Sequence, residues 1–213
     1  MLDLETALER VLSAIAPLPA ETVLVPNAHG RVLAAEVTAP LDLPAFDNSA
    51  MDGFAVRAAD LRDASGQNPV RLRCRERVAA GEVFASELLP GECVPISTGA
   101  ALPAGADAVV MIEDTRPAKD TPGQVEFCAV AGPGENVRRR GEDVARGARV
   151  LPAGQRVGVG ALALLAALGL REIKAARRPR IGLLATGSEL LEPGQPVRRP
   201  LTFWHRQVCL YSC

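Results

Sequence analysis

Short apolar runs, broken at close intervals by glycine and proline, are the feature that most limits the fold of this 213-residue chain. Between residues 57 and 130 the runs VRLRCRERV, GECVPI, ADAVVMIEDT and QVEFCAV are separated by Gly and Pro clusters. Regularly spaced short strands with turn signals between them are typical of all-β sheets and barrels. This stretch is therefore predicted to be β-rich, with a small barrel as one arrangement.

Two helices are predicted outside the β-rich stretch. Apolar residues recur at three- and four-residue spacing from Leu4 to Ile15, which indicates an amphipathic helix that ends near Pro17. The run VGVGALALLAALGL, from Val157 to Leu170, predicts a buried helix with a glycine near its end. Between the first helix and the β-rich stretch, ETVLVPNAHGRVLAAEVTAP predicts a strand, a turn, and a second strand or short helix.

The C-terminal part of the sequence carries two different patterns. The segment IGLLATGSEL predicts a buried strand from Ile181 to Ala185 and a turn into a helix, which is the opening of an α/β unit. From Leu201 the sequence LTFWHRQVCLYSC contains the only Trp and the only Tyr of the chain. This change of composition favours a foreign or out-of-frame tail, and the alternative is a C-terminal strand with aromatic residues.

Composition argues against several classes of function. The 24 Lys and Arg balance 25 Asp and Glu, so the chain lacks the positive field of a nucleic-acid-binding protein. The apolar run Val157 to Leu170 is too short to span a bilayer, and MLDLETALER has no signal-peptide layout. Five cysteines without a C-x-x-C pair suggest neither a disulfide framework nor a zinc site. We therefore expect a cytoplasmic protein with no nucleic-acid or membrane partner.

Candidate functional residues gather in four polar segments rich in glycine or small residues, at 47–53, 97–100, 135–143 and 184–190. Loops carried by a rigid scaffold are where binding groups concentrate. The chain has only two histidines, so carboxylates, hydroxyls and backbone amides are expected to carry any chemistry.

The first two segments offer oxygen ligands and hydroxyl donors. Asp47 and Asp52 are hard oxygen ligands suited to Mg²⁺, although this segment could equally form Asx turns and a strand cap. Ser97 and Thr98 carry hydroxyls that can donate to an anion, and Gly99 would let a ligand approach the backbone closely. The alternative for the second segment is an ordinary exit from a strand into a turn.

The third segment places three consecutive arginines beside acidic residues. Arg138, Arg139 and Arg140 could form a solvated charged face, or an anion site in which guanidinium groups match oxyanion geometry. Asp143 could stay ionised beside them and bind a metal.

The fourth segment is a small-residue turn between a predicted strand and a predicted helix. Thr186, Gly187 and Ser188 would lie at the helix N-terminus, where backbone amides can bind a phosphate. Thr186 and Glu189 also fit a capping box, which would leave the segment with a structural role alone.

Taken in order, DNSAMDGFAV, ISTGAALPAGADAVVMIEDT, GENVRRRGEDV and LLATGSELLEPGQP resemble the molybdopterin molybdenumtransferase family, to which the C-terminal part of gephyrin is related. The resemblance runs from about Leu4 to Pro196. It implies an elongated, L-shaped homodimer that inserts molybdate into adenylylated molybdopterin and releases AMP. A divalent cation, taken as Mg²⁺, would assist the reaction.

The resemblance also implies roles for residues that match the family's motifs. The implied catalytic residues are Asp52, Thr98, Asp143 and Glu189, and Asp52 and Asp143 would also hold the Mg²⁺. Many relatives have Asp at the position of Ser188. The residues expected to bind substrate are Ser97, Arg138, Arg139, Arg140, Thr186, Gly187 and Ser188.

The predicted fold class is α+β, multi-domain and elongated, with a β-rich insert domain, a mixed helix and strand linker domain, and the first βα unit of an incomplete α/β domain. The division of the chain is as follows: an N-terminal helix at 1–18, a linker and dimerisation domain at 19–44 and 144–175, the β-rich domain at 45–143, the start of a molybdopterin-binding domain at 176–196, and an aberrant tail at 197–213.

Family enzymes continue well beyond TGSELLEPGQP, and their catalytic cleft lies between a molybdopterin-binding domain of one subunit and the β-rich domain of the other. We therefore expect that this chain cannot complete the cleft alone. Three alternative functions remain open: a molybdenumtransferase, a non-catalytic fragment acting as a folding or dimerisation module, and a sugar- or peptide-binding β domain. The expected partners are a second copy of the chain and the molybdopterin adenylyltransferase.

Overall fold

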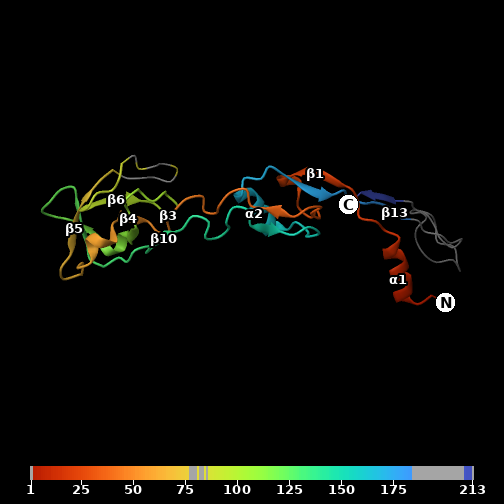
Figure 1. The fold of residues 1–213 in the computed structure, drawn as a ribbon, viewed down its shortest axis with the longest axis horizontal. Helices are drawn as coiled ribbons and strands as arrows, with labels where there is room; N and C mark the ends of the chain where they lie inside the picture. Colours follow the sequence, from red (N-terminus) through yellow and green to blue (C-terminus); the bar gives the residue numbers. More distant parts are fainter. Residues whose placement is uncertain (1, 77–80, 82–83, 85, 184–208, 213) are drawn as a thin grey trace, which may run out of the picture. The chain divides into compact units, whose positions relative to one another are not determined.

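The computed structural model describes residues 2–76, 81, 84, 86–183 and 209–212. The chain divides into two compact units, a terminal unit formed by residues 1–37 and 151–213 and a central unit formed by residues 38–150. Among the described residues there are two α-helices, and the other regular elements are strands and short 3₁₀ helices (Figure 1). Within the same residues, no helix is both long and apolar enough to cross a membrane.

A six-stranded sheet forms the body of the central unit, in the order β7-β4-β6-β5-β9-β8. All neighbours are antiparallel except β5 and β6, which run parallel. The strands are β4 (Gly53–Val56), β5 (Val70–Cys74), β6 (Glu92–Ile96), β7 (Ala108–Met111), β8 (Thr115–Pro117) and β9 (Gln124–Phe127).

The two outermost strands of this sheet, β7 and β8, are consecutive in the chain and are joined by a single 3₁₀ turn, η3 (Ile112–Asp114). The sheet must therefore curl until its two edges are one turn apart. The β-rich prediction is confirmed, but within the described residues the edges are not paired with each other, so the sheet is curled and open. The small-barrel arrangement stays a prediction.

Apolar side chains cover both faces of the sheet, because successive residues of a strand point to opposite sides. On β4, Val56 belongs to one buried cluster, together with Leu72 and Phe127, whereas its neighbour Ala55 belongs to another. The Phe54 and Phe127 rings meet edge to face, with centroids 5.7 Å apart. A second 3₁₀ helix, η2 (Ala58–Leu61), adds to the first cluster. Both faces are thus closed, and the site described below lies in the loops.

Two short strand pairs accompany the six-stranded sheet. Strand β3 (Asn48–Ser49) pairs antiparallel with β10 (Val137–Arg138), so segments about 90 residues apart in the sequence lie side by side (Figure 1). Strand β2 (Val37–Thr38) pairs with β11 (Arg149–Leu151).

The core of the terminal unit is built on the antiparallel pair β1 (Ala20–Leu24) and β12 (Glu172–Ala176). The 3₁₀ helix η1 (Val25–Asn27) follows β1 and contacts helix α2 (Val159–Ala167). Leu33 bridges to Ala175, and it is buried together with Leu165 and Leu168. The predicted strand at the start of ETVLVPNAHG is confirmed.

Helix α1 (Leu4–Ser13) confirms the prediction from periodicity. It begins after Asp3, whose Oδ1 accepts a hydrogen bond of 2.8 Å from the amide of Thr6, as an N-cap residue does. None of its residues is buried, and Leu4, on the apolar side, is 83% exposed. The amphipathic pattern therefore forms a helix whose apolar side no other described residue of this chain covers.

Helix α2 was predicted to be buried, and this prediction is wrong for most of its surface. Leu165 is the only buried residue of the helix, and Val159 is 74% exposed. The physical reason is that the helix is apolar on every side, whereas the rest of the terminal unit packs against the side of Leu165 only.

The strand predicted at Ile181 forms as β13 (Arg180–Leu183), but it is not the buried strand of a parallel sheet. It pairs antiparallel with β14 (Cys209–Ser212), and Ile181 is 47% exposed because a two-stranded ribbon offers no second layer within the described residues. Within 197–213, residues 209–212 thus form a strand, as the alternative interpretation of the tail expects. Residues 184–208, including the predicted turn into a helix, lie outside the described residues.

Candidate functional site

Three of the four predicted segments meet around strand β3. Ser49 donates its amide to the carbonyl of Ala100 (3.0 Å) and accepts from the amide of Gly99 (2.8 Å), which joins segment 47–53 to segment 97–100. On the other side, the amide of Ala50 donates to the carbonyl of Asn136 (2.9 Å), and β3 pairs with β10. The segment 47–53 therefore lies between the other two and holds them in one place.

Asp52 and Thr98 form the direct contact between the first two segments. Asp52 Oδ1 accepts hydrogen bonds from the amide of Thr98 (2.8 Å) and from its hydroxyl (3.2 Å). Both residues are exposed, while the neighbouring Ser97 is half-buried. The carboxylate thus fixes the Thr98 backbone and hydroxyl at the surface, where a ligand could reach them.

The position of Asp52 depends on local turns and on Gly53. The hydroxyl of Ser49 donates to the carbonyl of Met51 (2.5 Å) and accepts from its amide, which turns the chain before Asp52. Gly53 then enters β4 between β6 and β7, where a Cβ atom would overlap the carbonyl oxygen of Val110. The predicted polar turn is therefore present, and it presents the Asp52 carboxylate.

Arg138 is the first arginine of the third segment, and it is paired within its own loop. Its Nε donates to Glu142 Oε1 and its Nη2 to Asp143 Oδ2, both at 2.6 Å. These hydrogen bonds, chiefly the one to Asp143, raise the pKa of Arg138. The carboxylate of Asp143, which we predicted to bind a metal, is therefore shared with a guanidinium group.

Arg139 and Arg140 are paired with acids that precede β3. Arg139 Nη1 donates to Asp47 Oδ2 (2.7 Å), and the amide of Arg140 donates to Asp47 Oδ1 (2.8 Å). The Arg140 amide, followed by the Arg139 guanidinium, lowers the pKa of Asp47. Residues 138–140 are called the arginine loop below. Both oxygens of Asp47 thus accept hydrogen bonds that hold this loop.

Asp42 is an anchor of the arginine loop that sequence reasoning missed. It accepts from Arg140 Nε (2.6 Å) and from the Arg146 amide (2.7 Å), and the latter bond contributes most to the lowered pKa of Asp42. Nothing in the local sequence indicates this contact, because it joins residues 98 positions apart.

Asn136 also went unnoticed in the sequence. Its backbone is left-handed, with φ of 53°, and its side-chain amide donates to the carbonyl of Val109 (3.0 Å). Asparagine tolerates this backbone conformation better than most residues, which was the available signal in GENVRRR. It ties the loop to the six-stranded sheet.

The predicted metal ligands do not form a preorganised cluster in the described part of the chain. No group of three or more His, Cys, Asp and Glu side chains there is placed to hold a metal ion. Asp52 is exposed and bonded to Thr98, and Asp143 is paired with Arg138. Thr186, Gly187, Ser188 and Glu189 of the fourth segment lie outside the described residues.

Comparisons with known proteins show which family this chain resembles. Residues 2–169 match the model of the family described as MoeA N-terminal region (domain I and II). The molybdopterin molybdenumtransferase 2 of Mycobacterium tuberculosis is 47% identical over 177 residues, which cover 83% of this chain and 43% of the relative. The molybdopterin molybdenumtransferase of Staphylococcus aureus is 37% identical over 191 residues, covering 90% of this chain and 45% of the relative.

A solved structure gives the same result. The crystal structure of a molybdopterin biosynthesis MoeA protein from Pyrococcus horikoshii superposes with a TM-score of 0.82 at 35% identity, covering 90% of this chain and 50% of that one. The chain thus spans about half the length of the relatives that it matches. On the extent of the family match and the identity to these relatives, the chain belongs to the MoeA family of molybdopterin molybdenumtransferases.

Proposed function

We propose that this chain contributes one side of a site that inserts molybdate into adenylylated molybdopterin, with release of AMP, in molybdenum cofactor biosynthesis. The observation that carries the proposal is the convergence of segments 47–53, 97–100 and 135–143 around β3, with Asp52 bonded to Thr98 at an exposed surface. The names of the Mycobacterium tuberculosis and Staphylococcus aureus relatives support this choice of reaction.

The proposed reaction requires groups that bring two anions together. Molybdate and a phosphoanhydride repel each other, by about 4 kcal/mol per pair of unit charges at 4 Å and an effective dielectric constant of 20. The Thr98 hydroxyl donates its single proton to Asp52 Oδ1, so it could donate to one of their oxygens only after leaving that carboxylate. Arg138, Arg139 and Arg140, on β10 and the loop that follows it, offer guanidinium N–H donors that are at present paired with carboxylates of the chain.

A magnesium ion fits the donor chemistry of these residues, with Asp52 and Asp143 as its protein ligands. Mg²⁺ is commonly bound by one or two carboxylates together with substrate oxygens, and it rarely needs a complete protein cage. The absence of a three-carboxylate group among the described residues is compatible with a site that substrate completes. When bound, the ion would offset the negative charge that the two substrates bring together.

The test uses the chain in two forms, alone and as a chimaera. In the chimaera, this chain's matching residues replace the corresponding segment of the Mycobacterium tuberculosis relative, which supplies the part of the enzyme that this chain does not match. We expect the chimaera to release AMP from adenylylated molybdopterin in the presence of molybdate, and D52N to reduce the rate by roughly a hundredfold or more.

The matched control is D63N, which removes an exposed carboxylate from the same unit outside the three segments and should leave AMP release unchanged. Full AMP release by the D52N chimaera would refute the proposed role of this residue. AMP release by the chimaera but not by the chain alone would show that the chain needs residues that it does not contain.

A second candidate function is that of an association module, and the bare apolar sides of the helices favour it. Leu8 and Leu12 of α1 are 55% and 60% exposed, and Val159 of α2 is 74% exposed. Sedimentation of the wild-type chain and of L8Q/L12Q tests this function, because loss of self-association in the variant supports it and a monomeric wild type refutes it. We also propose that the chain forms a homodimer, that it interacts with the molybdopterin adenylyltransferase, and that it is located in the cytoplasm.

A further inference from the structure

A hollow lined by arginines lies in the terminal unit and shares no residue with the three segments of the proposed function. It has a volume of about 360 Å³, and its lining includes His29, Gly30, Arg156, Arg177 and Arg178. All of these residues belong to the terminal unit, so the hollow is complete within one unit. Its volume is within the range of sites that bind small molecules.

The frame of the hollow is fixed by backbone hydrogen bonds and one buried arginine. The amide of Gly30 donates to the carbonyl of Val157 (2.8 Å), and the amide of Ala176 donates to the carbonyl of Val32 (2.8 Å). Arg31 is 9% exposed, donates to the carbonyl of Ala176 (2.7 Å) and forms an ion pair with Glu21. The segment 29–32 is therefore fixed by hydrogen bonds to Val157 on one side and to Ala176, at the end of β12, on the other.

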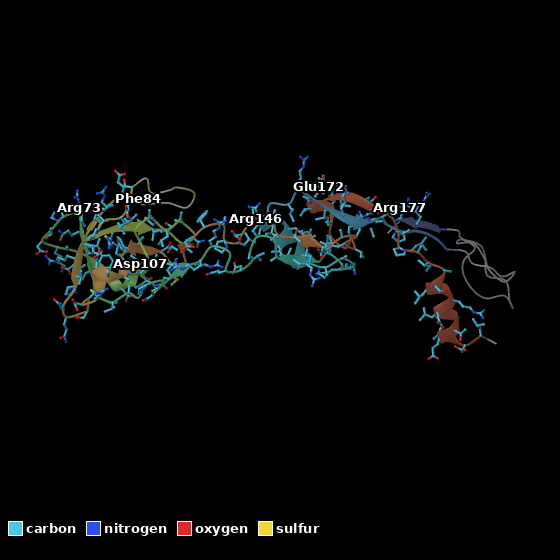
Figure 2. The ribbon with its side chains drawn as sticks, viewed as in Figure 1. Arg73, Phe84, Asp107, Arg146, Glu172 and Arg177 are labelled. Atoms are coloured by element: carbon cyan, nitrogen blue, oxygen red, sulfur yellow. The ribbon has the colours of Figure 1, made fainter. Side chains whose placement is uncertain are left out.

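The remaining arginines are attached to this frame. Arg156 bridges to Val32 through the backbone, and its guanidinium lies next to Gly30, where a Cβ would be 3.6 Å from Nη2. Arg177 directly follows β12, at the end of the strand opposite Glu172 (Figure 2), and its amide donates to the carbonyl of Pro19 (2.9 Å). Arg178 is next in the chain. Arg156 is thus held through its backbone bridge and Arg177 through its amide, and Arg178 follows in the link between β12 and β13.

The lining of the hollow carries an excess of positive charge. No acidic residue is among the residues that line it in the described chain, and Glu21 compensates only the buried Arg31. Arg156, Arg177 and Arg178 are exposed guanidinium side chains. Three like charges around one hollow repel one another, and a bound anion would relieve this repulsion.

From this charge and frame we propose that the hollow is a binding site for a phosphoryl group, either phosphate itself or a small phosphate ester. Guanidinium groups match phosphate geometry with paired N–H donors, and His29, which also lines the hollow, offers an additional polar group. The volume exceeds the needs of a single phosphate ion, so there is room for an organic substituent. The site uses no residue of the proposed molybdate-insertion site.

Calorimetric titration of the full chain at low ionic strength tests the proposal, with inorganic phosphate, pyrophosphate and phenyl phosphate as probes. Amide resonances of the ¹⁵N-labelled chain locate the site, and we expect Gly30 and Ala176 to shift. The variants R156Q and R177Q/R178Q should each weaken binding by roughly tenfold or more, which corresponds to about 1.4 kcal/mol. Binding should also weaken as salt is added.

The matched control is R171Q, which removes an exposed arginine of the same unit that does not line the hollow and should change affinity less than about twofold. Circular dichroism checks that the variants fold, which we expect because the substituted side chains are exposed. Tighter binding of phenyl phosphate than of phosphate would identify an ester as the ligand, and equal binding would identify the ion.

Three results would overturn the proposal. The first is an absence of heat and shifts with every probe up to about 10 mM, beyond which binding is too weak to matter. The second is equal affinity of R156Q, R177Q/R178Q and R171Q. The third is that shifts occur at Arg138 to Arg140 and not around Gly30. None of these results would bear on molybdate insertion, which depends on other residues.

Discussion

Replacement of Gly53 by alanine is the substitution for which the structure gives the clearest expectation. Gly53 begins β4 and lies between Ile96 of β6 and Met111 of β7. An added Cβ would overlap the carbonyl oxygen of Val110, and it would stand 2.9 Å from the carbonyl carbon of Val110 and 3.0 Å from Met111 Cα. All of these are backbone atoms, so no side-chain rotation can make room.

The cost follows from what must move. Overpacking of a well-packed interior costs about 1–3 kcal/mol where side chains can adjust, and more where the backbone has to shift. Here the pairing of β4 with β7 has to open, because Val110 also lies opposite Phe54 in that register. We therefore expect G53A to lower the free energy of unfolding of the central unit by at least about 3 kcal/mol.

Two other glycines provide controls for this substitution. A Cβ at Gly66 would meet nothing within 4 Å, and G66A should change stability by less than about 1 kcal/mol. Gly91 also has open space but a φ of +78°, so G91A should cost about 1–2 kcal/mol from backbone strain alone. Urea unfolding followed by far-ultraviolet circular dichroism measures all three. A G53A variant as stable as G66A would show that the steric argument is wrong.

Two further predictions concern the arginine loop. Because its hydrogen bonds lower the pKa of Asp47 in the folded chain, this carboxylate adds stability above its unfolded pKa of about 3.9, and the contribution is lost as pH falls through the lower folded value. The stability of D47N, measured by urea unfolding between about pH 7 and pH 3, should therefore fall less steeply with acid than that of wild type, and parallel curves would contradict this. N136A should lower the free energy of unfolding by about 1–2 kcal/mol, because alanine fits a φ of 53° poorly and the hydrogen bond to Val109 is lost. N136G retains the backbone conformation and therefore isolates the contribution of the hydrogen bond. Thermal unfolding measures both variants, and an N136A variant no less stable than wild type would refute the argument.

The helices show what the sequence can and cannot specify. The spacing of apolar residues from Leu4 to Ile15 was sufficient to predict α1, and the cap at Asp3 agrees with it. The same spacing says which side of the helix is apolar but not what covers that side, and in this chain nothing described does. The apolar run from Val157 to Leu170 was predicted to form a buried helix, but most of α2 is exposed. Burial depends on neighbours that a local pattern does not contain.

The site was predictable in its residue types and not in its contacts. The pairing of Asp52 with Thr98 joins residues 46 positions apart, and that of Arg139 with Asp47 joins residues 92 positions apart. The first contact depends on the backbone hydrogen bonds of Ser49 with Gly99 and Ala100. The second depends on the pairing of β3 with β10, two strands of two residues each, which is too short to leave a periodic signal in the sequence. The roles of Glu189 and its neighbours stay predictions, because those residues lie outside the described part of the chain.

The arginine loop has a consequence for the selectivity of the surface that it forms. Arg138, Arg139 and Arg140 each have a carboxylate partner in the chain, so the loop carries little uncompensated charge. An incoming anion must displace one of these carboxylate partners. The free energy that it gains is therefore the difference between the new ion pair and the one that is broken. Monoanions such as chloride gain little free energy from such an exchange. A dianion that accepts hydrogen bonds from two N–H groups at once can displace the carboxylate. The charge of the loop is therefore available to an anion only in exchange for one of its carboxylate partners.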